Sequence, residues 1–289
     1  MSISLFSFPI AKKMKLNGVW LGTLKPETLY IFIHGLGGSI FSRHHLISLL
    51  ASGKNAVLAF NNRGFGTINY LKQGEGKNKK YFPAGAAHEV FSDCVDDIDG
   101  AVAYARSQGV RRIFLLGHST GCQKSVYYLA KRPRVRVKGA ILLAPISDYS
   151  NVLRPQNRER YLRALAFAKR LKESGRPHDL LPSTLWPAPL DAQRFLSLYT
   201  AESAEEIFTY ASGKKPKTLR AVKRPILSIL AEFDEFADRP ARDIKTWFDG
   251  QLKTGKYNKS ALIKGIGHGF EGEERKVASL IRRWSQTIK

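Results

Sequence analysis

Short continuous apolar runs recur along the chain, and most of them end in glycine, asparagine or another turn-forming residue. They lie within residues 29–38, 55–66, 111–121, 137–145, 224–236 and 259–270. Strands exposed on one face alternate apolar and polar residues, whereas these runs are unbroken. Unbroken runs of this length indicate strands that are buried on both faces of a sheet.

Stretches with helical spacing separate these runs, within residues 43–51, 89–109, 122–131 and 273–288. Alternation of buried strands with amphipathic helices is typical of an α/β fold with a mostly parallel central sheet and helices on both faces. The length of 289 residues suits one such domain. We therefore expect a single domain over residues 1–289.

The alternation is interrupted once, between residues 151 and 223. This segment contains a basic amphipathic helix within residues 158–173 and a proline-rich turn region within 176–190. Two shorter helical pieces are expected at 191–200 and 203–212. We expect no second core of domain size in this segment and interpret it as a helical lid insertion over the edge of the sheet.

A serine stands between two glycines where a predicted strand passes into a predicted helix, in Gly117-His118-Ser119-Thr120-Gly121. A helix N-cap would explain the serine but not the flanking glycines. The pattern Gly-x-Ser-x-Gly between strand and helix is typical of a nucleophile elbow, in which a tight turn presents the serine hydroxyl to a substrate. We predict that Ser119 is a nucleophile.

A serine hydroxyl needs a base, and the base needs a carboxylate to orient it. Of the seven histidines, only His268 follows the last predicted strand and precedes the last helix. Asp234 ends the preceding predicted strand and is the expected acid. Asp148, at the end of the strand before the lid, remains the alternative.

Negative charge develops on the carbonyl oxygen when a serine attacks it, and backbone N–H groups must bind that oxygen. The residue after the nucleophile, Thr120, is expected to supply one N–H group. The loop His34-Gly35-Leu36-Gly37-Gly38 follows the first long apolar run. Leu36 or Gly37 of this loop is expected to supply the second.

Several segments resemble, in order and spacing, the landmarks of α/β-hydrolase fold enzymes. They are IFIHGLGGS, FNNRGFG, LLGHSTG, ILAEFDE and GIGHGF. The resemblance runs from about residue 29 to the C-terminus and leaves the lid uncovered. AGAAHEVFSDCVDDI together with GHSTGCQKSVYY is similar to a narrower subgroup described only as predicted serine hydrolases.

This resemblance implies a Ser119–Asp234–His268 triad, no cofactor and no metal, and hydrolysis of an ester-like bond. Members often read Asp-x-Arg-Gly where this chain has Asn61-Asn62-Arg63-Gly64. We expect Arg63 to make structural hydrogen bonds there and not to bind substrate.

The charge balance is strongly basic, with 47 lysines and arginines against 24 acidic residues and a net charge of +23. The basic residues are scattered and lack the fingerprint motifs of nucleic-acid modules, so no specific nucleic-acid partner is expected. Two cysteines, Cys94 and Cys122, imply no disulfide framework. No apolar run approaches the ~20 residues of a membrane span, and a cytoplasmic location is expected.

Together these features predict a serine carboxylesterase acting on a small-molecule acyl ester. Thioester hydrolysis or acyl transfer by the same residues is one alternative, and a non-catalytic protein that binds through its basic surface is another. The oligomeric state is left open. We expect the apolar residues of the lid to pack more often than to contact substrate; they are Leu162, Leu165, Phe167, Trp186 and Phe195.

Overall fold

A computed structural model describes residues 2–289 and contains one sheet of ten strands. The strands are β1 (Ile3–Ile10), β2 (Met14–Gly22), β3 (Thr28–Ile33), β4 (Asn55–Phe60), β5 (Asn69–Gln73), β6 (Lys80–Ala84), β7 (Ile113–His118), β8 (Gly139–Leu143), β9 (Ile226–Ala231) and β10 (Lys259–Ile263). The helices are α1 (His44–Leu50), α2 (Cys94–Ser107), α3 (Thr120–Lys131), α4 (Asp148–Val152), α5 (Pro155–Glu173), α6 (Ala192–Tyr199), α7 (Lys217–Ala221), α8 (Ala241–Leu252) and α9 (Glu274–Thr287).

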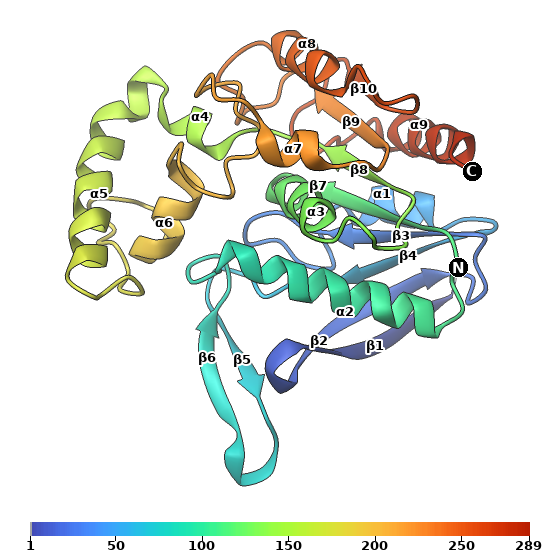
Figure 1. Ribbon diagram of the computed structural model, residues 1–289, viewed down its shortest axis with the longest axis horizontal. Coiled ribbons are helices and arrows are strands. Elements are labelled where there is room, and N and C mark those ends of the chain that lie inside the picture. The colour runs from blue at the N-terminus through green and yellow to red at the C-terminus, as the bar shows by residue number, and fades with distance from the viewer. Residues whose placement is uncertain (1) are drawn as a thin grey trace.

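The strands lie in the order β10-β9-β8-β7-β3-β4-β2-β5-β6, and β1 pairs with β2 outside this path (Figure 1). All pairs from β10 to β4 are parallel, and these strands are the apolar runs of the sequence. The predicted α/β fold with a mostly parallel sheet is therefore confirmed. The antiparallel strands β1, β2, β5 and β6 were not predicted. Their residues are largely exposed or alternate between exposed and buried, so they form no continuous apolar run.

Side chains on the two faces of the sheet pack into separate cores. Leu29, Ile31 and Ile33 of β3 pack with apolar residues of α2, α3 and α8. Tyr30 and Phe32 of the same strand pack with residues of α1 and α9 on the opposite face. Residues of a strand point alternately to the two faces, so both faces must be apolar when helices cover both.

Two helical predictions differ from the structure, and the helices α4, α7 and α8 were not predicted. Helix α2 begins at Cys94 and not at Glu89, because residues 89–90 have no regular structure and Phe91–Asp93 forms a 3-10 helix. Residues 203–212 form turns instead of a helix. The amphipathic helix α8 buries Ile244, Phe248 and Leu252 at four-residue spacing.

Between β8 and β9 the chain leaves the sheet and forms α4, α5, α6 and α7. We call residues 148–221 the insert; its α5 and α6 lie at the left of Figure 1, away from the sheet. Residues of α4, α5 and α6 form a third apolar cluster that includes Tyr161, Phe195 and Leu198. Within residues 2–289 there is no helix with the length and apolar character needed to cross a bilayer.

Candidate active site

Ser119 occupies a strained turn between β7, which ends at His118, and α3, which begins at Thr120. Its backbone has φ 54° and ψ −128°, which non-glycine residues seldom adopt and which costs about 1–3 kcal/mol. A Cβ atom at Gly117 would lie 2.3 Å from the carbonyl oxygen of Gly121, and one at Gly121 would lie 2.1 Å from that of Ile33. Both positions therefore require glycine for the strand and helix to approach this closely.

His268 lies in the loop after β10 and bonds to Asp234, in the loop after β9. Nδ1 of the imidazole is 2.8 Å from Oδ2 of Asp234, and both side chains are buried. An ionised carboxylate only accepts, so Nδ1 carries the proton and Nε2 is left as an acceptor for a hydroxyl proton. The second carboxylate oxygen, Oδ1, accepts the backbone N–H of Phe236 at 3.0 Å.

The backbone around His268 is held by side chains that the sequence did not single out for this purpose. Glu235 accepts the N–H of His268 at 2.9 Å, and Glu232 accepts the N–H of Gly265 at 2.9 Å. His118 Nε2 donates to the His268 carbonyl at 3.1 Å. Burial and the nearby His268 lower the pKa of His118 to about 3, so His118 is neutral and acts as a donor.

Asp148, the alternative acid, is the first residue of α4. Its Oδ2 accepts from Nε2 of Gln123 at 3.1 Å, whereas His268 Nδ1 donates to Asp234. Burial, and then the carboxylate of Glu205, raise the pKa of Asp148 to about 7. The two candidate acids therefore lie in different hydrogen-bond environments, and only Asp234 is placed to orient the imidazole.

The loop after β3 approaches the elbow closely. A Cβ atom at Gly35 would lie 2.8 Å from the Cβ of Ser119. His34 fixes this loop: Asn62 N–H donates to Nε2 at 3.1 Å, and Nδ1 donates to the Gly35 carbonyl at 2.8 Å. Burial, reinforced by the charge of Lys124, lowers the pKa of His34 to about 4, which keeps the imidazole neutral.

Ser119 and His268 open into one cavity of about 440 Å³, within the usual range for a small-molecule site. Its walls come from loops at the carboxyl ends of the parallel strands and from the insert. The lining residues are Gly35, Leu36, Gly38, Ser42, Arg43, His118, Ser119, Ile146, Asp148, Asn151, Val152, Asn157, Arg160, Trp186, Pro187, Tyr199, Phe236 and His268. Leu36 thus lies in the cavity wall with Ser119. Thr120 begins α3, where helix N–H groups lack a carbonyl partner four residues earlier.

Of the five apolar residues singled out in the predicted lid, only Trp186 lines this cavity. Phe195 is buried in the insert cluster, and Leu165 and Phe167 pack against that cluster. Leu162 is exposed to solvent on α5. Packing is therefore the main role of these side chains.

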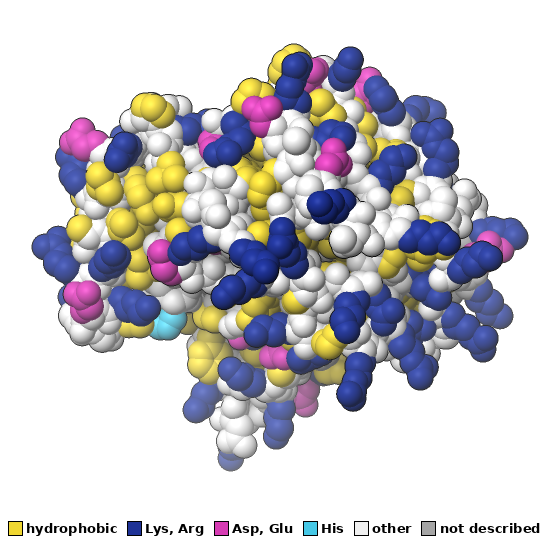
Figure 2. All heavy atoms as spheres, turned by 45° about the horizontal axis from the view of Figure 1, so that its top comes forward, with side chains coloured by type: hydrophobic (Ala, Val, Ile, Leu, Met, Phe, Trp, Pro, Cys, Tyr) yellow, Lys and Arg dark blue, Asp and Glu magenta, His cyan; other side chains and the backbone are white. Residues whose placement is uncertain are grey.

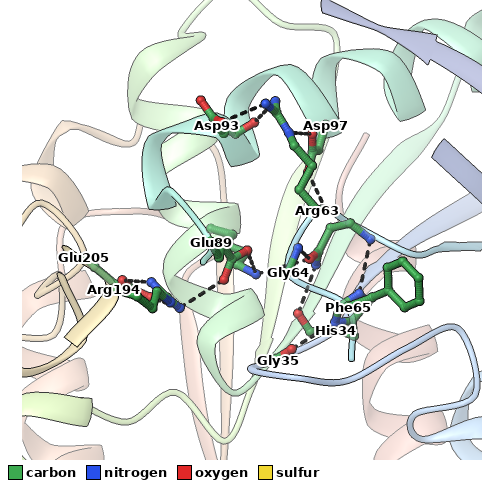
Figure 3. A network of polar contacts seen from close by, with 12 residues as sticks. His34, Gly35, Arg63, Gly64, Phe65, Glu89, Asp93, Asp97, Arg194 and Glu205 are labelled. Carbon is green, nitrogen blue, oxygen red and sulfur yellow. Dashed lines mark hydrogen bonds and ion pairs between the residues drawn. The ribbon is translucent and has the colours of Figure 1, made fainter. Parts of the chain in front are cut away.

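A chain of buried charges joins α3 to the insert (Figure 3). Lys124 Nζ on α3 lies 2.5 Å from Glu89, and Arg194 on α6 lies 3.0 Å from the same carboxylate and 2.5 Å from Glu205. All four side chains are almost completely inaccessible to solvent. This network could not be predicted from the sequence, because isolated lysines and arginines on amphipathic helices are usually solvated.

Arg63 follows β4 and makes its hydrogen bonds within the fold. Its Nε donates to Asp97 at 2.6 Å and its Nη1 to Asp93 at 2.7 Å (Figure 3). Arg63 does not line the cavity that contains Ser119. The arginine therefore ties the turn after β4 to the start of α2, as expected of a structural residue.

Basic side chains are dispersed over the surface. In Figure 2 lysine and arginine side chains are scattered over the visible face from the insert to the β5–β6 hairpin, among polar and apolar areas and with fewer acidic side chains. Cys94 and Cys122 are both buried and unpaired. Burial raises the pKa of both thiols well above its ordinary value, so neither is a reactive thiolate at neutral pH.

Three features define an α/β-hydrolase fold. They are the order of the strands, the strained serine after β7, and the Asp234–His268 hydrogen bond between the loops after β9 and β10. A family model described as "Protein of unknown function (DUF1749)" matches residues 88–289, which is more than half of the chain. The chain belongs to this family. No curated protein matches it.

Solved structures with the same fold include α/β-hydrolase GrgF from Penicillium, with a TM-score of 0.68, 14% identity and coverage of 100% of this chain and 99% of that one. A soluble variant of monoglyceride lipase from Saccharomyces cerevisiae has a TM-score of 0.70 at 13% identity, with coverage of 99% of this chain and 96% of that one. Monoacylglycerol lipase from Paleococcus ferrophilus has a TM-score of 0.61 at 20% identity, with coverage of 94% of this chain and 98% of that one. At these identities the similarity is one of fold.

Proposed function

We propose that the chain is a serine hydrolase that cleaves a carboxylic ester through an acyl-enzyme intermediate. The observation that carries this proposal is the convergence of Ser119 and the Asp234-paired His268 on one cavity. Esterases and lipases among the proteins of the same fold support it.

In the proposed reaction, the Ser119 hydroxyl gives its proton to His268 Nε2 as its oxygen bonds to the ester carbonyl carbon. The backbone N–H groups of Leu36 and Thr120 bind the resulting oxyanion. His268 then protonates the leaving alcohol as the ester bond breaks. Water then attacks the acyl carbon and gives a proton to the same imidazole, which passes it to the Ser119 oxygen as the acyl–serine bond breaks and the carboxylic acid leaves. Asp234 stabilises the imidazolium in both halves.

The test is hydrolysis of a short-chain aryl ester by the wild type, Ser119→Ala and His268→Ala. Each variant should lose several orders of magnitude in kcat while remaining folded. Ser107→Ala is the matched control, because its exposed hydroxyl lies outside the cavity, donating to the Tyr104 carbonyl at 2.8 Å and accepting from Gln108 Nε2 at 3.3 Å. Turnover by Ser119→Ala at the wild-type rate would contradict the proposed mechanism.

The scattered basic surface supports only weak, non-specific binding of nucleic acid, with a Kd on the order of 10⁻⁴–10⁻⁶ M that weakens steeply with salt. A duplex titration at two salt concentrations tests this part of the proposal. Tight binding that resists salt would instead favour a binding function on the basic surface.

A further inference from the structure

One charged side chain in the wall of the Ser119 cavity has no counter-charge. Arg160 on α5 lines the cavity together with Asn157, one turn earlier on the same helix face. Arg163, further along α5, pairs with Glu159 at 3.7 Å. Arg160, by contrast, is exposed at the edge of the cavity and forms no ion pair with any residue between 2 and 289. Its guanidinium is therefore available to a ligand.

The other two charged residues of the wall, beside the catalytic His268, do not cancel this charge. Arg43 already has a partner within the fold, the carboxylate of Glu271. Asp148 bonds to Gln123, and burial with the nearby Glu205 raises its pKa to about 7, so it carries only part of a negative charge near neutral pH. The wall therefore has an excess of positive charge on the side of the insert.

The remaining lining is mostly apolar and includes Leu36, Ile146, Val152, Trp186, Pro187, Tyr199 and Phe236. Ser119 enters the cavity from the end of β7, whereas Arg160 enters it from α5 of the insert. A ligand that reaches both needs an apolar body between its reacting carbonyl and an anionic group. The anionic group of such a ligand would pair with the Arg160 guanidinium, and its apolar body would contact the apolar lining.

We infer that the ester hydrolysed at Ser119 carries an anionic group, a carboxylate or a phosphate, remote from the scissile bond, and that Arg160 selects for it. This inference rests on the proposed function. A guanidinium binds such oxyanions through paired hydrogen bonds, which gives direction as well as attraction. The net charge of +23 adds a long-range field that draws in the same ligands.

Two matched pairs of esters test the inference and separate the acyl side from the alcohol side. On the acyl side, the para-nitrophenyl monoester of adipic acid is compared with para-nitrophenyl hexanoate, in which a methyl group replaces the carboxylate. On the alcohol side, para-carboxyphenyl hexanoate is compared with para-carbamoylphenyl hexanoate. The quantity measured is the ratio of kcat/KM for the anionic ester to that for its neutral partner.

In Arg160→Met this ratio should fall about 10-fold for at least one pair, because a charge-assisted hydrogen bond is lost. Arg160→Glu should lower it further through like-charge repulsion. Arg160 and Arg163 are both exposed on α5, but only Arg160 lines the cavity. Arg163→Met removes an equal charge from the same helix outside the cavity and should change the ratio less than about 2-fold.

Unchanged ratios in Arg160→Met, or an equal fall in Arg163→Met, would overturn the inference. Any preference for anionic esters would then come from the diffuse field of the basic surface. Neutral esters hydrolysed through Ser119 would in that case still support the proposed function. If none of the four esters shows Ser119-dependent hydrolysis, the proposed function itself fails.

Discussion

Glu89→Gln removes the central charge of the buried network and should destabilise the fold strongly. Glu89 is 5% exposed and lies between Lys124 and Arg194, both 0% exposed. The amide keeps the shape of the side chain, but Lys124 then has no counter-charge, whereas Arg194 keeps Glu205. Removal of one partner of a buried pair costs about 3–5 kcal/mol. Because one of the two cations stays paired, we expect a loss of about 3 kcal/mol.

Urea unfolding at neutral pH measures this loss, with Glu27→Gln as the matched control. Glu27 pairs with Lys54 at 2.6 Å, but the two side chains are 65% and 78% exposed. Removal of an exposed pair costs less than about 1 kcal/mol. Equal free energies of unfolding for the two variants would refute the stabilising role of the network.

The pH dependence of the Glu89→Gln effect follows from the same charges. Burial raises the pKa of Glu89, but Lys124 and Arg194 together outweigh burial and hold that pKa below its ordinary value of 4.5. The stabilisation is therefore complete above pH 4.5 and is lost as the pH falls through the lower, folded-state value. The stability difference between wild type and Glu89→Gln should shrink below pH 4.5; a constant difference would contradict this reasoning.

Three further predictions concern the site and the insert. Asp234→Asn should lower kcat for a short aryl ester by about 10⁴-fold and Asp148→Asn by far less, and the reverse order would move the acid to α4. Burial raises the pKa of Glu206 to about 8, so wild-type stability should fall as the pH rises from about 4.5 to 8, and urea unfolding of Glu206→Gln should show a weaker fall. Trp186→Ala should shift the acyl chain-length preference, whereas Phe195→Ala should chiefly lower the free energy of unfolding, by about 3–5 kcal/mol.

The parallel half of the sheet and the elbow were predictable from the sequence because each depends on local pattern. Continuous apolar runs identify strands buried on both faces, and glycines 117 and 121 lie where a Cβ atom would collide with the backbone. The β1–β2 hairpin was not predicted, because the residues with positive φ in its turn are Lys12 and Lys13 and not glycines. Nothing in a turn without glycine, proline or asparagine marks its position in the sequence.

The environment of the candidate triad was predictable only in part. Chain order selected His268 and ranked Asp234 first, but it did not assign roles to the neighbouring carboxylates. Glu232 and Glu235 hold the histidine loop through backbone N–H groups, and such contacts depend on the distance between two loops in space. The Lys124–Glu89–Arg194 network was unpredictable for the same reason, since its members lie far apart in the sequence.

The most direct test of the proposed chemistry is labelling with a fluorophosphonate probe, followed by mass spectrometric mapping of the modified residue. The probe reacts with an activated serine whatever the natural substrate is. We predict a single adduct on Ser119 in the wild type, and its loss in Ser119→Ala and in folded His268→Ala. An unlabelled wild type, an adduct on a different serine, or labelling of His268→Ala at the wild-type rate would contradict a nucleophile at Ser119 activated by His268.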